Sequence, residues 1–172
     1  MQTYVVLLRG INVGGKNILP MKELAQLLEN LGYQNVRTYI QSGNVVLRST
    51  TRPGDEIAAE IESHYGFRPR VFTIDADALA QASSNNPFPQ GEAKQVHFFF
   101  CHTPPVQPDT DRIEQLRAES EQYALTDRVF YLYAPEGIGR SKLAAGIERC
   151  LGVPVTARNL NTIKKLLTRA EG

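Results

Sequence analysis

Two short segments constrain the fold of this chain most, because each has the pattern of a strand that is covered on both faces. Residues 4–8 are apolar at every position, and residues 96–101 also look apolar on both faces. A strand with one exposed face would instead alternate apolar and polar residues. The sequence therefore predicts one central strand in each half of the chain, with a core around each.

The elements around the first central strand are predicted to follow the order strand, helix, strand, strand, helix, strand. A stripe of leucines follows Pro20, which suits the first helical position, and Gly32 suits the cap that ends this helix. Gly43 lies in a hairpin signal between two β-branched and aromatic runs. The remaining predicted elements are strands at 36–41, 45–47 and 70–74, a helix from Pro53 to Gly66, and a short helix at 75–82.

The second half repeats this order with little residue identity. We expect strands at 96–101, 123–125, 128–133 and 153–156 and helices at 110–119, 141–151 and about 159–170. This predicts an α+β fold of tandem ferredoxin-like (βαββαβ) plaits with extra helices. The predicted domains are residues 1–84 and 92–172, and the breaker-rich residues 85–91 form the linker. Because a plait leaves one sheet face open, the other half, the extra helices or a second subunit of a homodimer must cover it.

Composition excludes several classes of protein. The formal net charge of +1 over 172 residues argues against a general nucleic-acid coat, although residues 140–172 carry seven cations and two acids. Residues 109–121 carry five acids and two cations. The two cysteines show no pairing pattern, which indicates a reducing, cytoplasmic setting. We find no signal peptide and no apolar run long enough to cross a membrane, so we expect no membrane partner.

The stretch from Arg9 to Asn17 is the strongest candidate for a binding site. It contains three glycines, two cations and two asparagines between a predicted buried strand and a predicted helix. Glycine lets successive N–H groups point at an anion, and a helix N-terminus adds partial positive charge. The alternative is an ordinary loop whose glycines serve only the turn.

Three further polar clusters join this stretch. They are the hairpin at 41–44, the loop at 137–142 and the segment at 158–162; each could also be a plain turn or a helix cap. Together the clusters predict a surface for an anionic, phosphate-bearing ligand, a nucleotide or a nucleic acid. The residues assigned to ligand binding are Arg9, Asn12, Gly14, Gly15, Lys16, Asn17, Gln41, Ser42, Asn44, Arg140, Ser141, Lys142, Arg158 and Asn159.

Metal and nucleophile chemistry find no support in the sequence. His97 and Cys101 share one strand face while His102 points away, so they lack the separated ligand pairs of structural zinc. The Gly-x-Ser-x-Gly elbow of serine hydrolases does not occur. No catalytic residue, metal ligand or cofactor is therefore assigned. Phe98 and Phe100 share a face without a flanking cation, so we expect them in the core and not on an RNA-recognition surface.

The same motifs carry a family resemblance. The segments at 4–17 and 38–46, Met21, and the C-terminal stretch at 156–163 closely resemble domain-of-unknown-function family 1697, whose members are small bacterial proteins. Leu160 stands where members usually carry an aromatic residue. The resemblance implies a small α/β protein of tandem ferredoxin-like units, and it implies no activity.

Three functions therefore remain open. The chain could be a binding module for a phosphate-bearing ligand, an enzyme acting on such a ligand, or a dimeric interaction protein. A carboxylate or histidine close to Arg9 and Lys16 would favour the enzyme, because chemistry needs a base or a nucleophile.

Overall fold

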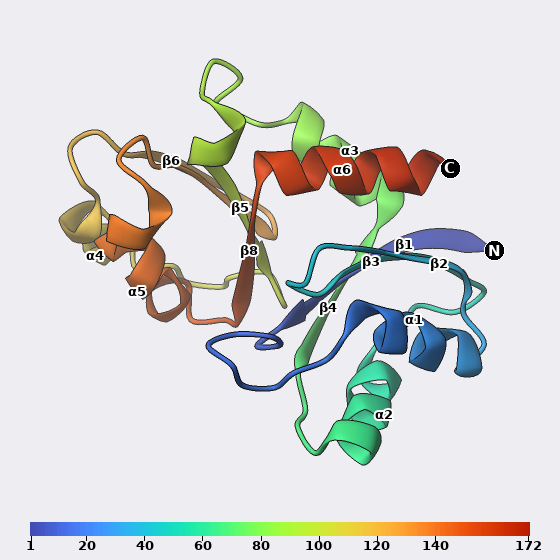
Figure 1. Cartoon of the computed structure of the whole chain (residues 1–172). Coiled ribbons are helices and arrows are strands. Elements are labelled where there is room, and N and C mark those ends of the chain that lie inside the picture. The colour runs from blue at the N-terminus through green and yellow to red at the C-terminus, as the bar shows by residue number, and fades with distance from the viewer. The chain divides into compact units, whose positions relative to one another are not determined.

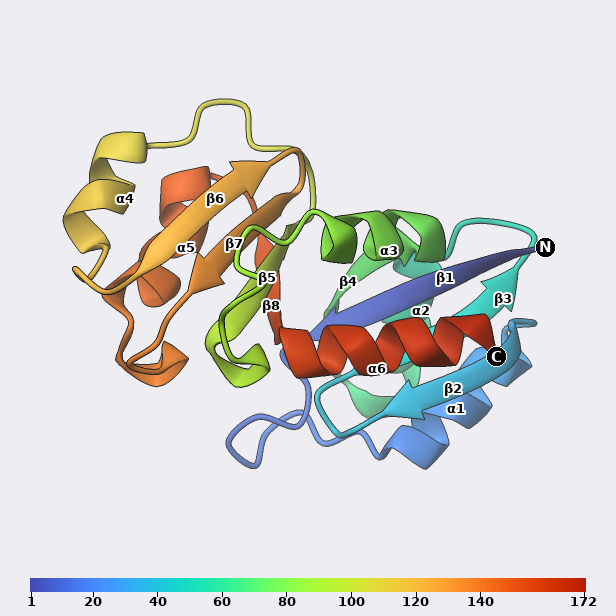
Figure 2. The ribbon, with the colours of Figure 1, turned by 90° about the horizontal axis from the view of Figure 1, so that it is seen from above.

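The protein is a mixed α+β molecule with six α-helices and two four-stranded antiparallel sheets (Figures 1 and 2). The structure is a computed structural model that describes residues 1–172. The elements are β1 (Gln2–Arg9), α1 (Met21–Asn30), β2 (Gln34–Tyr39), β3 (Asn44–Ser49), α2 (Asp55–Tyr65), β4 (Arg70–Asp75), α3 (Ala76–Ser84), η1 (Ala93–Gln95), β5 (Val96–Cys101), α4 (Thr110–Leu116), β6 (Gln122–Thr126), β7 (Val129–Tyr133), η2 (Ile138–Arg140), α5 (Lys142–Leu151), β8 (Val155–Asn159) and α6 (Leu160–Glu171).

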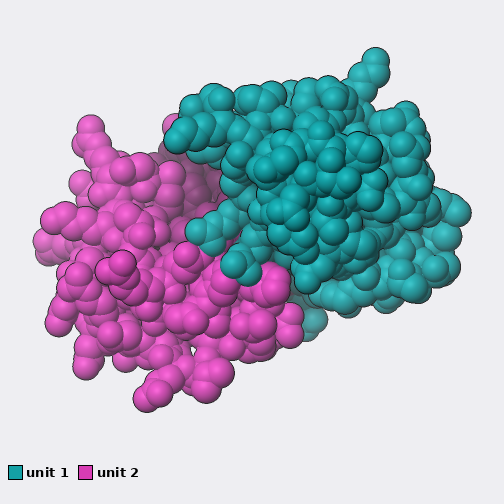
Figure 3. All heavy atoms as spheres, turned by 90° about the horizontal axis from the view of Figure 1, so that it is seen from below, with its two compact units in different colours: residues 1–81, 164–172 teal, residues 82–163 magenta.

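The chain divides into two compact units, which are coloured separately in Figure 3. Unit 1 contains residues 1–81 and 164–172, and unit 2 contains residues 82–163. The sequence instead predicts a boundary after residue 84 and places the whole C-terminal helix in the second domain. The predicted linker, residues 85–91, follows α3 directly, and its role as a linker stays a prediction.

The sheet of unit 1 has the strand order β2-β3-β1-β4, and all neighbouring strands are antiparallel. Leu7 of β1 lies opposite Asn44, the first residue of β3. Arg9, the last residue of β1, lies opposite Arg70, the first residue of β4. The end of β1 and the starts of β3 and β4 therefore meet at one end of the sheet.

Both faces of this sheet are covered. Tyr4, Val6 and Leu8 belong to the core cluster on the face where α1 and α2 pack (Figure 1). Leu7, on the opposite face, is completely buried. The register places Tyr39 on this second face, and the Arg169 guanidinium of α6 lies 4.9 Å from the centre of the Tyr39 ring. The C-terminal part of α6 therefore covers part of the face that a single plait would leave open.

The sheet of unit 2 has the corresponding order β6-β7-β5-β8. Phe99 and Cys101 of β5 pack in a core with residues of α4 and α5 (Figure 1). On the other face, Phe98 and Tyr131 are buried and meet edge to face at 4.8 Å. The Tyr131 hydroxyl donates a hydrogen bond of 2.8 Å to the carbonyl of Ala82. Core packing thus accounts for Phe98, as the sequence predicts.

Several element boundaries differ from the predicted ones for local reasons. Pro20 is the N-cap of α1 and not its first helical residue. Helix α4 ends at Leu116 because the backbone of Arg117 is extended, with a ψ of 129°, and the Arg117 side chain donates to the Glu121 carbonyl at 2.9 Å. Strand β8 continues to Asn159, three residues beyond its predicted end. None of the helices combines the length and the apolar character needed to cross a membrane.

Candidate functional site

The glycine-rich stretch forms a tight turn between two bridged residues. Val13 and Lys16 form an antiparallel bridge, and the Lys16 N–H donates to the Val13 carbonyl at 3.0 Å. Gly14 and Gly15 between them have φ angles of 57° and 74°. Positive φ at both central residues is the signature of a type I′ turn. Turn geometry therefore accounts for both glycines, and neither glycine N–H donates a hydrogen bond within the chain.

Asn12 fixes this turn against the neighbouring loops. Its Nδ2 donates to the carbonyls of Leu19 at 2.9 Å and Gln41 at 2.8 Å, and its Oδ1 accepts from the Leu19 N–H at 2.7 Å. Asn17 Nδ2 donates to the Gly10 carbonyl at 2.9 Å. The two asparagines therefore position the loop internally, as their residue type allows in tight turns.

The hairpin between β2 and β3 lies directly against the end of β1. The Leu8 N–H donates to the Gly43 carbonyl at 2.8 Å. Gly43 has a φ of +85°, and a Cβ there would lie 2.9 Å from the Leu8 Cβ, so no larger residue fits. Asn44 is completely buried and donates to the Tyr39 carbonyl and the Ser42 hydroxyl. The first two predicted clusters therefore meet at one end of the unit 1 sheet.

Positive charge gathers at this end. Arg9 and Arg70 lie directly opposite each other on adjacent strands, and both side chains are exposed. Lys16 is exposed as well. Asn17, which follows Lys16, is hydrogen-bonded to Gly10, which follows Arg9, so the two cations lie on adjoining parts of the loop. Like charges directly opposite on a sheet repel each other. No local sequence pattern points to Arg70, because only the strand register shows that it lies opposite Arg9.

The two clusters of unit 2 also share one sheet end, since Tyr133 and Asn159 both lie beside the start of β5. Arg140 and Lys142 are exposed there. Ser141 is buried, and its hydroxyl accepts from the Ala144 N–H at 3.0 Å as the N-cap of α5. Asn159 Oδ1 accepts from the Thr162 N–H at 3.0 Å at the start of α6. Both side chains thus serve as helix caps.

Arg158 differs from the exposed cations. Its Nη1 donates to the Thr156 hydroxyl and to the Ala157 carbonyl, both at 2.8 Å. Burial lowers the pKa of its guanidinium to about 10, because the charged form loses hydration. The group stays protonated at neutral pH, so Arg158 is a part-buried cation that donates to a backbone carbonyl and a hydroxyl oxygen.

His97 and Cys101 are both buried in unit 2. Burial lowers the pKa of the His97 imidazole, and a hydrogen bond to the Lys94 backbone partly opposes this by raising the pKa. His97 Nε2 has no hydrogen-bond partner. Burial raises the pKa of the Cys101 thiol to about 11, which makes it a poor nucleophile at neutral pH. No cluster of three or more His, Cys, Asp or Glu residues could hold a metal ion.

Comparison with known proteins identifies a family and a similar solved structure. The model of the family described as "Protein of unknown function (DUF1697)" matches residues 1–131. The solved structure described as "conserved bacterial protein SP0830 from Streptococcus pneumoniae" has a TM-score of 0.67 and 26% sequence identity, with 98% of each chain covered. No curated protein matches the chain.

Proposed function

The chain belongs to this family of proteins of unknown function, and we propose that it binds an anionic, phosphate-bearing ligand, a nucleotide or a nucleic acid, through the loops of unit 1. The observation that carries the proposal is the pairing of Arg9 with Arg70 at the loop-bearing end of the sheet.

The arginine pair favours an anion between or beside the two side chains. Arg70 forms no ion pair with a carboxylate, and its side chain is exposed. Two unit charges about 4 Å apart interact by about 1 kcal/mol even in water, so an anion bound beside both guanidinium groups would gain from both charges. Guanidinium groups bind phosphate in a bidentate manner, and two of them on neighbouring strands present a broad donor surface.

Lys16 and the backbone of the turn add to this surface. The type I′ turn exposes Gly14 and Gly15, whose N–H groups are available to an acceptor. Asn12 holds the turn against two other segments, so ligand binding would not need to order it. A site that is ordered in advance loses less conformational entropy on binding.

The acids of unit 1 favour binding over catalysis. Asp75 pairs with Arg52 at 2.5 Å and lies opposite Tyr4, away from the loop-bearing end. Glu62 pairs with Arg68 at 3.2 Å and the His64 ring lies 2.9 Å from Glu60, both within or beside α2. Asp75, Glu62 and His64 each have a partner within unit 1, and this internal pairing supports a binding module.

We also infer that each unit is a ferredoxin-like plait, so that the chain is a tandem pair. The support is the order βαββαβ in each unit and the equivalent strand orders β2-β3-β1-β4 and β6-β7-β5-β8. Under this inference the loop after β7, with Arg140 and Lys142, offers a second basic site beside a helix N-terminus.

Binding of tripolyphosphate and of a short single-stranded oligonucleotide, measured by calorimetry at two salt concentrations, tests the function. Replacing Arg9, Arg70 or Lys16 with Ala should each weaken binding by about 1.5–3 kcal/mol, the scale of a charged hydrogen bond. Each variant should also reduce the salt dependence, because fewer counterions are released.

Arg48→Ala is the matched control, since Arg48 is an exposed arginine toward the other end of the same sheet, opposite Thr3. It should change binding by less than about 0.5 kcal/mol. Equal losses in all four variants would indicate diffuse electrostatics. Unchanged binding in the Arg9, Arg70 and Lys16 variants would exclude the proposed site.

A further inference from the structure

Three loops carry four of the five exposed large hydrophobic side chains of the protein. Val13, Ile18 and Ile40 of unit 1 are 64%, 56% and 51% exposed, and Val106 of unit 2 is 96% exposed. Single exposed apolar residues are ordinary, but a group of them on one surface marks an interaction site.

The group in unit 1 is surrounded by positive charge. We define the basic patch as Arg9, Val13, Lys16, Ile18 and Ile40. Asn12 connects the three hydrophobic residues of the patch. Its amide donates to the carbonyls of Leu19, next to Ile18, and Gln41, next to Ile40, and Val13 directly follows Asn12 in the chain. Residues 9–22 contain three cations and no acid. The patch therefore combines aliphatic groups with a basic surrounding.

Ile40 is held outward by a strained backbone. Its φ of 47° is a conformation that β-branched residues rarely adopt and that costs about 1–3 kcal/mol. The side chain is half exposed, so burial of its apolar surface offsets little of this strain. Such strain is typical of residues whose presentation at a surface matters more than stability.

Val106 lies in a loop with the opposite charge. We define the proline loop as residues 103–108, in which Pro104, Pro105 and Pro108 surround Val106. The residues on either side of it are anchored, since the His102 N–H donates to the Pro154 carbonyl at 2.9 Å and the Asp109 N–H to the Cys150 carbonyl at 2.8 Å. Figure 2 shows the loop between β5 and α4 extending beyond the strand ends of its own sheet. Prolines restrict the loop in advance, which lowers the entropy lost on docking.

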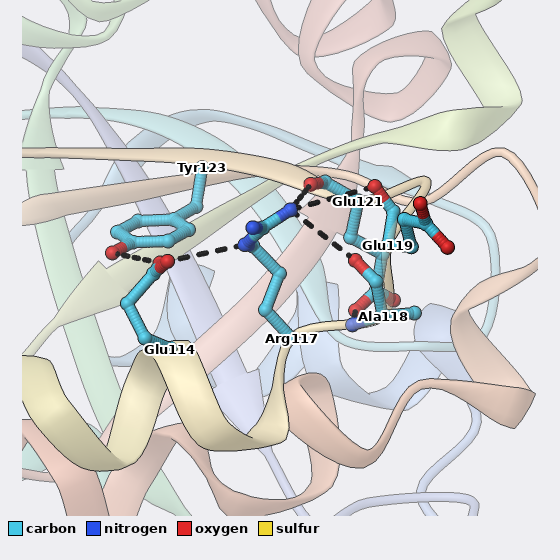
Figure 4. A network of polar contacts seen from close by, with 6 residues as sticks. All are labelled: Glu114, Arg117, Ala118, Glu119, Glu121 and Tyr123. Carbon is cyan, nitrogen blue, oxygen red and sulfur yellow. Dashed lines mark hydrogen bonds and ion pairs between the residues drawn. The ribbon is translucent and has the colours of Figure 1, made fainter.

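The acids that flank the proline loop are Asp109 and Asp111, both exposed. Residues 103–111 contain these two acids and no cation. Acids later in the segment are used internally: Glu114 accepts from the Tyr123 hydroxyl at 2.6 Å and lies 3.4 Å from Arg117, and Glu121 accepts from the Ala118 N–H at 2.9 Å (Figure 4). Asp109 Oδ1 also accepts from the Arg112 N–H at 3.1 Å as the N-cap of α4. The negative charge beside Val106 comes from the two aspartates, and the exposed Arg112 that follows them offsets one of the two charges.

We propose that the proline loop of one copy docks on the basic patch of a second copy of this chain. Val106 would pack among Val13, Ile18 and Ile40, while Asp109 and Asp111 would face Arg9 and Lys16. Both the apolar groups and the charges are complementary, and each copy carries one of each surface. The contact is heterologous, so every copy can bind two others and association need not stop at a dimer.

The small size of the three loops limits the strength of this contact. Stable interfaces bury about 1,200–2,000 Å², and loops of this length bury less. Association is therefore weak, and low salt strengthens it because the charged groups are exposed. A phosphate-bearing ligand on Arg9 and Lys16 would compete with the contact, but the contact does not depend on that ligand.

Sedimentation velocity of the full chain, from low micromolar to near-millimolar concentration, tests the proposal. The average mass should rise with concentration at low salt and fall when salt is added. Val106→Arg and Lys16→Glu should each raise the dissociation constant at least about tenfold, because each places like charges in the contact. Both sites are exposed, so thermal melting should match that of the parent protein.

A mixture of the two variants distinguishes this contact from others. The Val106→Arg chain keeps a basic patch and the Lys16→Glu chain keeps a proline loop, so together they should form a pair that stops at two copies. A parent protein that stays monomeric, variants that associate like the parent, or a mixture that stays monomeric would each overturn the proposal. The Val106→Arg chain should bind tripolyphosphate like the parent protein, because Val106 lies outside the proposed ligand site. Loss of self-association in this chain is therefore independent of ligand binding.

Discussion

At the scale of single residues, Gly43 is the position where the backbone conformation and the close packing require glycine. Its φ of +85° is strained for any other residue, and a Cβ would lie 2.9 Å from the Leu8 Cβ and 3.0 Å from the Leu8 carbonyl oxygen. Gly43→Ala should therefore destabilise the protein by about 2 kcal/mol or more, through strain and overpacking together. Urea unfolding monitored by circular dichroism measures this cost.

Gly14 provides the matched comparison. It also has a positive φ, of 57°, but a Cβ there would meet nothing within 4 Å. Gly14→Ala should cost about 1 kcal/mol, from the backbone conformation alone. If the two alanine variants proved equally stable, the close approach of the hairpin to β1 would not limit the choice of residue at Gly43.

His97 gives the stability of the protein a dependence on pH. Burial lowers the pKa of its imidazole below the ordinary value of 6.5, so the unfolded chain binds a proton more readily than the folded one. The stability that the neutral ring contributes is complete above the unfolded pKa and decreases as the pH falls below about 6.5.

Urea unfolding at about pH 7.5 and about pH 5.5 checks this sign. The parent protein should lose stability between the two values, and His97→Gln should lose less. His64→Gln serves as the control, because His64 is exposed and lies beside Glu60. A parent protein as stable at the lower pH as at the higher one would contradict the prediction.

At the scale of elements, Asn12 connects the turn at Gly14 and Gly15 to the hairpin of β2 and β3. Asn12→Ala removes two donated hydrogen bonds and one accepted bond. It also forces a positive φ on alanine. The loss should be about 2–3 kcal/mol of stability, since each net hydrogen bond contributes about 1 kcal/mol.

The effect of this variant on ligand binding should differ in kind from that of Arg9→Ala. Loosened loops weaken binding without removing a phosphate contact, so the slope of affinity against salt should stay unchanged. Arg9→Ala should instead reduce that slope by about one ion. A reduced slope in the Asn12 variant would mean that Asn12 acts on the charge of the site as well as on its shape.

Periodicity in the sequence was enough to predict the strands and helices, because apolar spacing records which side of an element is buried. Gly66 and Gly152 end α2 and α5 in the left-handed conformation that their residue type predicts. No local pattern predicts strand register, so the sequence does not show that Arg70 lies opposite Arg9. No local pattern shows the internal role of Asn12 either, because its side chain donates to the carbonyl of Gln41, 29 residues away.

At the scale of the whole molecule, the C-terminal part of the last helix, α6, contributes to the stability of unit 1. Residues 164–172 belong to unit 1, and Leu166 is completely buried. Arg169 stacks on Tyr39 in the same unit. A chain that ended before α6 would therefore lose part of the covering of the first sheet, although the first 81 residues contain all four of its strands.

Leu166→Ala tests whether this covering is local to unit 1. Truncating a fully buried leucine should cost about 2–5 kcal/mol, from lost burial and the cavity left behind. Hydrogen exchange should become faster in β2 and β3, because local opening follows the packing that is lost. Leu143→Ala is the control, since Leu143 is a fully buried residue of the unit 2 core, and it should accelerate exchange in β5 and β7. Faster exchange in the unit 2 strands alone after Leu166→Ala would show that the C-terminal segment does not stabilise the first sheet.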